Sequence, residues 1–520
     1  MNRGSWGSRV TGSALLALLW VSGPAHADFE IREEWVDQTV QARDGGSWLA
    51  KHDSVLFGTQ SIYQACVGRR PPNGAKVYYH CFGQGVLGPA THGEAVNTAR
   101  IQRLTAVDGG VLVVANVGWQ AGNGSCACYP WLFRMDDDGS VRWSQMLSPT
   151  LTGQARVTDM GHRPGDADAY LAAVIAEPSP TPWDPRSVRA QSVVSRVDVS
   201  NGQIIDSLRL DRKEVWWPAS PSFPEYSSTM MFQIFALRVD PNGEVVVGGV
   251  NYFHLSDPWA GSFDRHSAST YAFAARIDAG ERQLRHAWRA RYQPASDTPY
   301  RRDLAVELLA PGADQSQVAS LVSTETGDSF GPQFDLVMLD AGGNLSWRRT
   351  LDRERWQRRQ IHALVRAPDG GVVASVSRTN LPAPMVSTAA SIESFGVAGQ
   401  LRARIESTLP QDTATINRTY HSGLDLRGDG SGDVAIGSLW LGNGRYAHDE
   451  IHAKSGTLKH FSCSWTRPSL AGSEIGPTQW ATPVFRNFTP QLVKGNWLVA
   501  SPLPLPMQSH VSRVTQRICP

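Results

Sequence analysis

One phrase recurs along this 520-residue chain, and the recurrence limits the fold more than any other feature of the sequence. An apolar run broken by Asp-Gly or Asn-Gly appears as "IQRLTAVDGGVLVVANVG" from Ile101, "FALRVDPNGEVVVGGV" from Phe235 and "IHALVRAPDGGVVASVS" from Ile361. A fourth copy, "GLDLRGDGSGDVAIGS", begins at Gly423. Short runs rich in Val, Leu and Ala on either side of a glycine turn are typical of β-hairpins. The chain should therefore consist of repeated hairpins that stack on one another.

A second phrase follows the first at some distance. Its clearest copies are "WLFRMDDDGSVRWSQML" from Trp131 and "FDLVMLDAGGNLSWRRTL" from Phe334. Two hairpins per repeat make four strands, which is one blade of a β-propeller. With looser copies from Val157 and Ala305 included, the first-phrase copies begin near residues 101, 155, 232, 303, 361 and 421, at irregular intervals of 54 to 77 residues. We therefore predict an all-β chain that forms a single β-propeller of about seven four-stranded blades, with six or eight as alternatives.

The repeats also predict how the chain is divided. Residues 1–27 are expected to be a secretory signal peptide, residues 28–95 an N-terminal β segment that closes or joins the propeller, and residues 96–520 the propeller. A degenerate further copy can be read in "QLVKGNWLVASPL" from Gln491 and "SHVSRVTQRIC" from Ser509. No sustained helical periodicity is found after residue 27. The alternative is two packed β domains, but repetition through most of the chain favours one propeller.

The double phrase resembles the repeats of bacterial extracytoplasmic β-propellers, of the delta-sixty type and more loosely of the quinoprotein-like type. The resemblance covers roughly residues 100–465 and is one of repeat pattern rather than of catalytic residues. It implies a propeller outside the cytoplasm. Quinone-dependent members of this group tend to carry a Cys-Cys pair and a D-x-x-T-G-x-x-x-W phrase, and neither stands in this sequence. No cofactor is therefore expected.

The first 27 residues predict export. Arg3 and Arg9 precede the apolar run "ALLALLWV", and Ala25-His26-Ala27 forms an A-x-A cleavage site. The apolar run is too short to span a bilayer, and no later stretch is long enough. Removal of the signal changes the formal net charge from +1 to −1. The chain therefore has no excess of positive charge with which to bind nucleic acid. The protein is expected in the periplasm or outside the cell.

Six cysteines in an exported chain predict disulfides rather than free thiols. Six cysteines allow 15 pairings, so the sequence alone does not fix the connectivity. We expect Cys66 to pair with Cys81 across "GRRPPNGAK", and Cys463 to pair with Cys519.

The loop "DLRGDGSGD" spaces three carboxylates, those of Asp425, Asp429 and Asp433. It resembles the calcium loop of integrin-type FG-GAP repeats, D-x-N-G-D-G-x-x-D, which implies a calcium ion held by these acids and a backbone carbonyl. The sequence departs from that pattern at Arg427, which stands where the family has Asn or Asp. A guanidinium cannot ligate calcium and can pair with the same carboxylates. The two interpretations are a calcium site and an ion-paired turn.

Two long segments outside the repeats are unusually aromatic. "EVWWPASPSFPEYSSTMMF" joins one repeat to the next, and "NYFHLSDPWAGSFDRHSASTYAF" interrupts another. Loops usually avoid so much aromatic area, which must be buried or used for binding. The candidate ligand-binding residues are Trp216, Trp217, Tyr226, Tyr252 and Trp259. The alternative is that these side chains fold over one propeller face as a small satellite core.

No catalytic motif stands in the sequence: there is no G-x-S-x-G elbow, Walker loop or dinucleotide fingerprint. We therefore expect a non-catalytic exported scaffold that binds a protein, peptide or glycan. The alternative is an extracytoplasmic enzyme, either a quinone-dependent oxidoreductase or a glycan-active hydrolase or lyase. A third interpretation is a structural envelope component, which would form stable oligomers. The sequence alone does not establish the oligomeric state.

Overall fold

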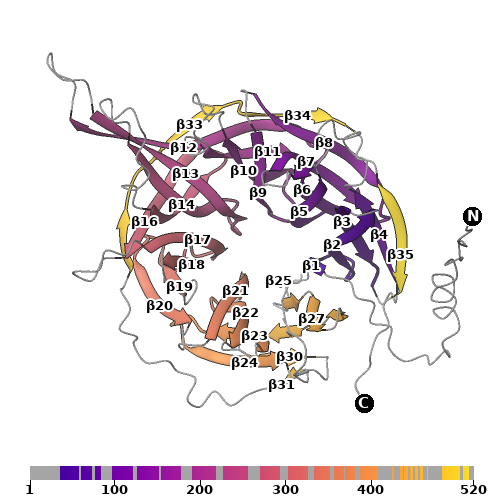
Figure 1. Cartoon of the computed structure of the whole chain (residues 1–520). Helices are drawn as coiled ribbons and strands as arrows, with labels where there is room; N and C mark the ends of the chain where they lie inside the picture. The colour runs from indigo at the N-terminus through magenta and orange to yellow at the C-terminus, as the bar shows by residue number, and fades with distance from the viewer. Residues whose placement is uncertain are drawn as a thin grey trace, which may run out of the picture.

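The chain forms a ring of β-sheets in the computed structural model (Figure 1). No helix that could span a membrane occurs among the described residues. The ring confirms the all-β class and is consistent with a β-propeller, whereas the count of seven blades stays a prediction. The structure describes residues 36–57, 60–72, 76–82, 96–120, 126–150, 154–176, 190–217, 226–255, 270–292, 302–325, 333–351, 357–367, 369–380, 387–407, 424–426, 434–436, 438–442, 445–448, 451–454, 457–460, 465–466, 483–503 and 507–513.

Groups of four consecutive strands, each paired antiparallel with the next, build most of the ring. We number these groups as units in chain order. Unit 1 contains β1 (Val36–Gln41), β2 (Ser47–Phe57), β3 (Gln60–Arg70) and β4 (Lys76–Phe82). Unit 2 contains β5 (Val96–Val107), β6 (Gly110–Gln120), β7 (Cys126–Asp136) and β8 (Val141–Pro149). Unit 3 contains β9 (Gln154–His162), β10 (Asp168–Ala176), β11 (Ala190–Asp198) and β12 (Ile204–Trp217).

The next three units continue the same order around the ring. Unit 4 contains β13 (Tyr226–Val239), β14 (Val245–Leu255), β15 (Thr270–Asp278) and β16 (Gln283–Tyr292). Unit 5 contains β17 (Arg302–Pro311), β18 (Gln317–Glu325), β19 (Gln333–Leu339) and β20 (Leu345–Leu351). Unit 6 contains β21 (Gln357–Arg366), β22 (Val372–Asn380), β23 (Ser387–Phe395) and β24 (Leu401–Ser407).

The first strand of each unit is the innermost, and the fourth lies at the outside of the ring (Figure 1). Neighbouring innermost strands contact one another in the order β1, β5, β9, β13, β17 and β21. Short hairpins fill the arc between units 6 and 1. These are β25 (Leu424–Leu426) with β26 (Val434–Ile436), β27 (Ser438–Gly442) with β28 (Arg445–His448), and β29 (Ile451–Lys454) with β30 (Thr457–His460). Strand β25 contacts both β21 and β1, and β30 contacts β24.

The hydrophobic core is a series of interfaces between neighbouring units rather than one central mass. One cluster joins Val67 of unit 1 to Val113 of unit 2, and another joins Ala236 of unit 4 to Val306 of unit 5. Such clusters cover both sheet faces of units 2 to 5, which explains why the repeats carry continuous apolar runs rather than strict alternation. The arrangement leaves the ring axis and the outer rim as the free sides of the sheets.

Glycine turns close the hairpins, as the repeated phrase predicts. In the turn between β13 and β14, Gly243 has φ +89° and its N–H donates to the Asp240 carbonyl at 3.0 Å. Gln315 holds the corresponding place between β17 and β18 with φ +64°. A side chain in this left-handed region costs about 1 kcal/mol or more, whereas glycine adopts it freely. Unit 5 thus differs from the other five units, which have glycine at this position of the turn between their first and second strands.

Replacing Gln315 with glycine should stabilise the protein. We expect Gln315→Gly to raise the free energy of unfolding by about 0.5–1 kcal/mol, because relief of strain exceeds the added freedom of the unfolded chain. The Gln315 side chain is exposed, and the backbone makes two contacts: the carbonyl accepts from Arg276 at 2.9 Å and the N–H donates to the Gly312 carbonyl at 3.2 Å. Urea titration measures the change. The matched control is Gly109→Ala, with φ +73° and open space around the new Cβ, which should destabilise by a similar amount. A loss of stability in Gln315→Gly would contradict this account of the turn.

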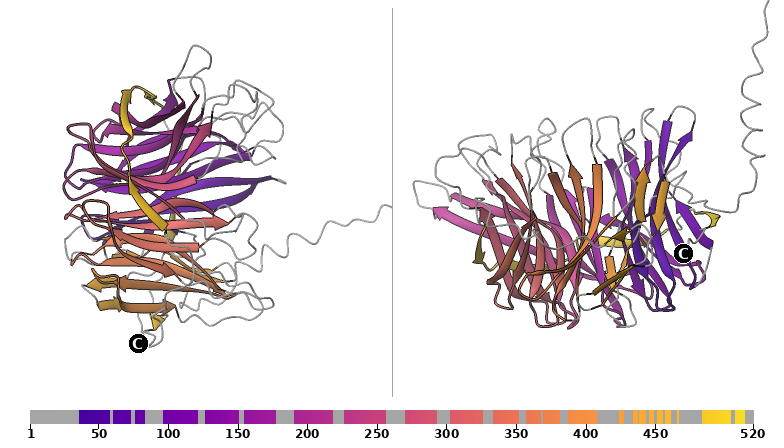
Figure 2. Two further views of the ribbon diagram at one scale, coloured as in Figure 1. Left: turned by 90° about the vertical axis from the view of Figure 1, so that its left-hand side faces the viewer. Right: turned by 90° about the horizontal axis from the view of Figure 1, so that it is seen from below.

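A segment from the end of the chain runs around the outer rim and adds a fifth strand to several units (Figures 1 and 2). Its strands are β32 (Pro483–Asn487), β33 (Gln491–Gly495), β34 (Leu498–Pro502) and β35 (Gln508–Arg513). They pair antiparallel with β16, β12, β8 and β4, so the segment passes units 4, 3, 2 and 1 in descending order. We call residues 483–513 the belt. A two-residue strand before it, β31 (Trp465–Thr466), pairs with β24 of unit 6.

The belt corrects one sequence prediction. The stretches from Gln491 and Ser509, read as a degenerate further repeat, do not form a blade. Strands β33 and β34 look like a hairpin in sequence, but each pairs with a different unit. Belt side chains also enter the cores between units. Phe488 stacks on Phe232 with ring centroids 6.1 Å apart, and Phe485 packs edge-on against Trp288 at 5.3 Å.

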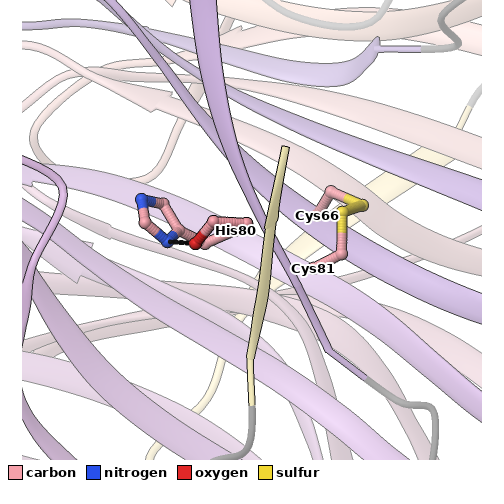
Figure 3. The surroundings of a disulfide bond; sticks show 4 residues. Cys66, His80 and Cys81 are labelled. Carbon is pink, nitrogen blue, oxygen red and sulfur yellow. Dashed lines mark hydrogen bonds between the residues drawn. A yellow bond between two sulfur atoms is a disulfide. The ribbon is translucent and has the colours of Figure 1, made fainter. Parts of the chain in front are cut away.

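The predicted disulfide between Cys66 and Cys81 is confirmed. The two residues are direct partners on the antiparallel strands β3 and β4, with their Cα atoms 3.9 Å apart (Figure 3). Both are buried, in a small cluster with Leu49 and Tyr79. The other edge of β4 pairs with the belt strand β35, where the Ser509 hydroxyl lies 2.9 Å from His80 Nδ1. The disulfide therefore fixes the strand on which the belt ends. Cys463 and Cys519 lie outside the described residues.

Candidate ligand site on the ring axis

A β-bulge interrupts the innermost strand of every unit from 1 to 6. In β17, Val306 and Leu308 face consecutive residues of β18, which leaves Glu307 as the extra residue. In β21, His362 is the extra residue between Ile361 and Ala363. Bulges re-aim a side chain and are common next to binding sites. The extra residues in units 1 to 6 are Asp37, Gln102, Thr158, Phe235, Glu307 and His362.

These residues stand at one level of the ring. Gln102 precedes the turn residue Gly109 by seven positions, and Glu307 precedes its turn residue Gln315 by eight. A strand rises about 3.3 Å per residue, so a difference of one position is small along the axis. The bulges therefore form one layer around the centre.

The bulged side chains are more accessible than the buried residues that precede them. Phe235 is 37% exposed, whereas Ile234 and Ala236 are each 1% exposed. Glu307 is exposed beside the fully buried Val306. Because both sheet faces are packed and one strand edge is hydrogen-bonded, the free direction is the inner edge, toward the axis (Figures 1 and 2). We call Gln102, Thr158, Phe235, Glu307 and His362 the axial residues; the side chain of Asp37 is not described.

Sequence reasoning missed the axial residues, although a signal for them exists. The residue before each described bulge is a buried β-branched aliphatic, whereas the bulged residue itself changes from repeat to repeat. The preceding residues are Ile101, Val157, Ile234, Val306 and Ile361. Aligning the repeats on this Ile or Val would have separated the structural position from the variable one. A bulge breaks the two-residue period of a strand, and for this reason a search for alternation passes over it.

Side chains of the preceding unit hold several bulges in place. Gln38 of unit 1 donates to the Gln102 carbonyl at 2.7 Å and accepts from the Leu104 N–H at 2.9 Å. Asn116 of unit 2 makes the same two-way contact with the backbone of Val157, at 2.9 and 3.0 Å. These contacts satisfy the backbone groups that a bulge removes from the ladder. The axial layer is thus positioned by side chains that do not belong to it.

Glu307 and His362 lie on neighbouring innermost strands, β17 and β21, which contact each other. Burial raises the pKa of the Glu307 carboxyl, and burial lowers the pKa of His362 to about 4. Both shifts disfavour the charged form, as expected where the surrounding protein makes a charge harder to solvate. At neutral pH, His362 adds no positive charge to this layer.

The shift at His362 predicts a pH effect on stability. Its pKa is lower in the folded protein than the usual 6.5, so the unfolded chain takes up the proton first as the pH falls. The corresponding stability is present above pH 6.5 and is lost between pH 6.5 and about 4. After allowing for the partial exposure of His362, we expect the wild type to lose about 2 kcal/mol over this window that His362→Gln does not lose. Urea unfolding of both proteins at pH 7 and 4.5 tests this, and equal pH slopes would contradict it.

Of the three predicted calcium ligands, one lies within the described residues. Asp425 lies in β25, where its backbone partner is Ala435 of β26, so the loop joins two paired strands. The side chain of Asp425 is not described, and Asp429 and Asp433 lie outside the described residues. Within the parts that the structure describes, no group of three or more His, Cys, Asp or Glu side chains could hold a metal ion.

The predicted aromatic loops are partly strands. Trp216 and Trp217 belong to β12 and Tyr226 to β13, and these strands pair with each other up to Trp217 and Tyr226. Tyr252 belongs to β14 and is the backbone partner of Met231. The expectation of loops was wrong at these positions, because long paired strands continue past the body of units 3 and 4. Their side chains are not described, and Trp259 lies outside the described residues.

No protein-family model matches the chain, and no curated protein matches it.

Proposed function

We propose that this protein is an exported β-propeller of seven blades that binds a protein, peptide or glycan and does not catalyse a reaction. The axial residues carry this proposal. At one equivalent position, successive repeats carry glutamine, threonine, phenylalanine, glutamate and histidine. The Thr158 hydroxyl donates to the Ala172 carbonyl at 3.3 Å, so the varied groups left for a ligand are those of the other four residues. A position with a purely structural role would keep chemically similar residues, as the position before each described bulge keeps Ile or Val. Varied polar and aromatic groups that converge on one place are typical of a ligand site.

Support for seven blades comes from the circuit of innermost strands. Strand β25 contacts β21 on one side and β1 on the other, so the hairpins from β25 to β30 occupy the place of one further unit. Support for export comes from the signal-like residues 1–27 and from the disulfide between Cys66 and Cys81, which is typical of oxidising compartments. The pattern-level resemblance to extracytoplasmic propeller repeats agrees with a propeller that is exported.

The test is native mass spectrometry of the protein purified from its own host, compared with its denatured mass. We expect a bound peptide or glycan that is lost on denaturation, and we expect Phe235→Ala to reduce its occupancy. Phe235→Ala leaves the flanking core residues in place, and circular dichroism checks its folding. A calcium-sized excess mass that Asp429→Ala abolishes would establish the predicted calcium loop. The absence of any bound ligand, from the host or after incubation with peptide and oligosaccharide mixtures, would overturn the binding proposal.

The opposed shifts of Glu307 and His362 favour a second candidate, a glycan-active hydrolase or lyase. A carboxyl whose pKa is raised can act as a general acid, and a neutral imidazole can act as a general base. This candidate predicts turnover of an oligosaccharide that Glu307→Gln and His362→Gln each abolish. Binding without turnover, unaffected by these variants, would exclude it.

A further inference from the structure

Glu307 differs from the buried acids of the ring in having no positively charged partner among the described residues. Asp159 pairs with Arg238, Asp335 with Arg348 at 3.0 Å and Glu393 with Arg404 at 3.0 Å. Burial is the cause of the raised pKa of Glu307, and no arginine offsets it. Glu307 therefore lacks the arginine partner that each of these other acids has. The Glu307 side chain is nevertheless exposed, so its carboxyl is open to a ligand, and a bound cation would favour the charged form that the surrounding protein disfavours.

An aromatic ring stands on the neighbouring strand at the same level. Phe235 and Glu307 each precede their turn residue, Gly243 and Gln315, by eight positions. Strands β13 and β17 contact each other, and Ala236 and Val306 share one hydrophobic cluster. The packing here is close, because a Cβ added to Gly248, the partner of Ala236, would lie 2.7 Å from Val306 Cγ1. The ring of Phe235 and the carboxyl of Glu307 are thus adjacent positions of one layer.

We propose that the axis binds an organic cation, an alkylammonium or guanidinium group, with Glu307 as its counter-ion and Phe235 as the aromatic face beside it. A cation within about 6 Å of an aromatic centroid is attracted by the ring, and desolvation strengthens this attraction. The neutral imidazole of His362 on the other side of Glu307 does not repel a positive charge. The inference rests on the proposed binding function and names the ligand chemistry at that site.

The cation must reach into the ring along its axis. Glu307 lies five residues from the start of β17, which is roughly 16 Å along the strand at 3.3 Å per residue. Two sources supply such a group: a lysine or arginine side chain of an extended peptide, and a free aliphatic polyamine. The experiment below separates them.

The test measures binding by isothermal titration calorimetry with defined probes. These are the peptide acetyl-Ala-Ala-Lys-Ala-Ala-amide, the same peptide with Nε-acetyl-lysine, and 1,5-diaminopentane. We expect the lysine peptide to bind the wild type and the acetylated peptide to bind at least about ten-fold more weakly, since its charge is gone. Binding of the diamine alone, without the peptide, would assign the site to free polyamines.

Matched variants locate the site. Glu307→Gln keeps the shape of the side chain and should weaken cation binding about ten-fold or more, and Phe235→Leu should weaken it about three- to ten-fold. Glu281→Gln, an exposed acid that pairs with Arg285 away from the axis, is the control and should bind as the wild type does. Unchanged melting temperatures confirm that the variants fold.

Three results would overturn the inference. One is cation binding that Glu307→Gln leaves unchanged, and another is no binding of either cation to the wild type. The third is equal binding of the lysine and acetyl-lysine peptides, which would refute the cation requirement. In that case, axial variants that still weaken the binding of a neutral peptide or glycan would leave the proposed function standing. If no ligand of any kind binds, both the cation inference and the proposed binding function are refuted.

Discussion

A chain that ends at residue 482, and so lacks the belt, should lose about 5–10 kcal/mol of stability and fail to unfold as one cooperative unit. The belt side chains that pack between units are Phe485, Phe488, Leu492, Trp497 and Leu498. Fully burying such a side chain contributes roughly 1.5–3 kcal/mol, and of these five Phe488 and Leu498 are buried while the other three are partly buried. The truncation also leaves the outer edges of β4, β8, β12 and β16 without partners. The expected loss is comparable to the whole stability of an ordinary domain.

Urea unfolding followed by circular dichroism and by limited proteolysis measures this effect. The matched control is Phe488→Ala in the full chain, which keeps every strand pairing of the belt. It should cost about 3–5 kcal/mol, because Phe488 is 8% exposed and stacks on Phe232. A truncated chain with the same unfolding midpoint as the full chain would show that the belt does not stabilise the ring.

The second large effect is expected at Arg276, where Arg276→Leu should cost about 3–5 kcal/mol. Arg276 pairs with Asp240, which is completely buried, and with Glu244 at 2.8 Å. It also donates to the Gln315 carbonyl of unit 5 at 2.9 Å. Removing the guanidinium leaves the Asp240 carboxylate buried without a counter-charge and breaks the link between two units.

A second substitution separates these two causes. Asp240 also accepts from the backbone N–H groups of Asn242 at 2.8 Å and Glu244 at 2.9 Å, and an asparagine oxygen can continue to accept from them. Asp240→Asn added to Arg276→Leu should therefore recover about half of the loss, since no buried charge is left. Urea titration of the single and double variants provides the measurement. A double variant less stable than Arg276→Leu would contradict the buried-charge explanation.

The repeated phrase predicts much of the ring, because its pattern is set by side chains. Apolar runs between glycine turns reflect sheets packed on both faces, and Gly243 stands where the left-handed turn requires it. The belt follows no such pattern. Strands β32 to β35 pair with sheet edges through backbone hydrogen bonds, which constrain side chains little, and only a few apolar belt side chains enter the cores between units. The same holds for the hairpin of β12 and β13, whose aromatic residues suggest loops although the backbone pairs.

The candidate site was less predictable than the ring. Its residues are defined by one-residue irregularities, and the layer exists only once six distant strands stand side by side. Glu307 in "LAVELLAP" and Phe235 in "FQIFALRV" read as ordinary strand residues in sequence. Their significance comes from the neighbours that the ring supplies. A search for metal-binding or nucleophile motifs finds carboxylates in turns and loops instead. There the carboxylates accept hydrogen bonds from backbone N–H groups, as Asp138 accepts from Ser140 at 2.8 Å.

The path of the belt has a consequence for the order of folding. His80 meets Ser509, a partner 429 positions later in the chain, and Thr150 donates to Asn496 across 346 positions. Contacts of such long range form slowly, because the intervening chain must be ordered first. Until then the outer edges of units 1 to 4 stand open, and an open strand edge readily pairs with another chain. The yield of folded protein should therefore fall as the concentration of half-made chains rises, and the first unit to emerge waits longest for its last strand.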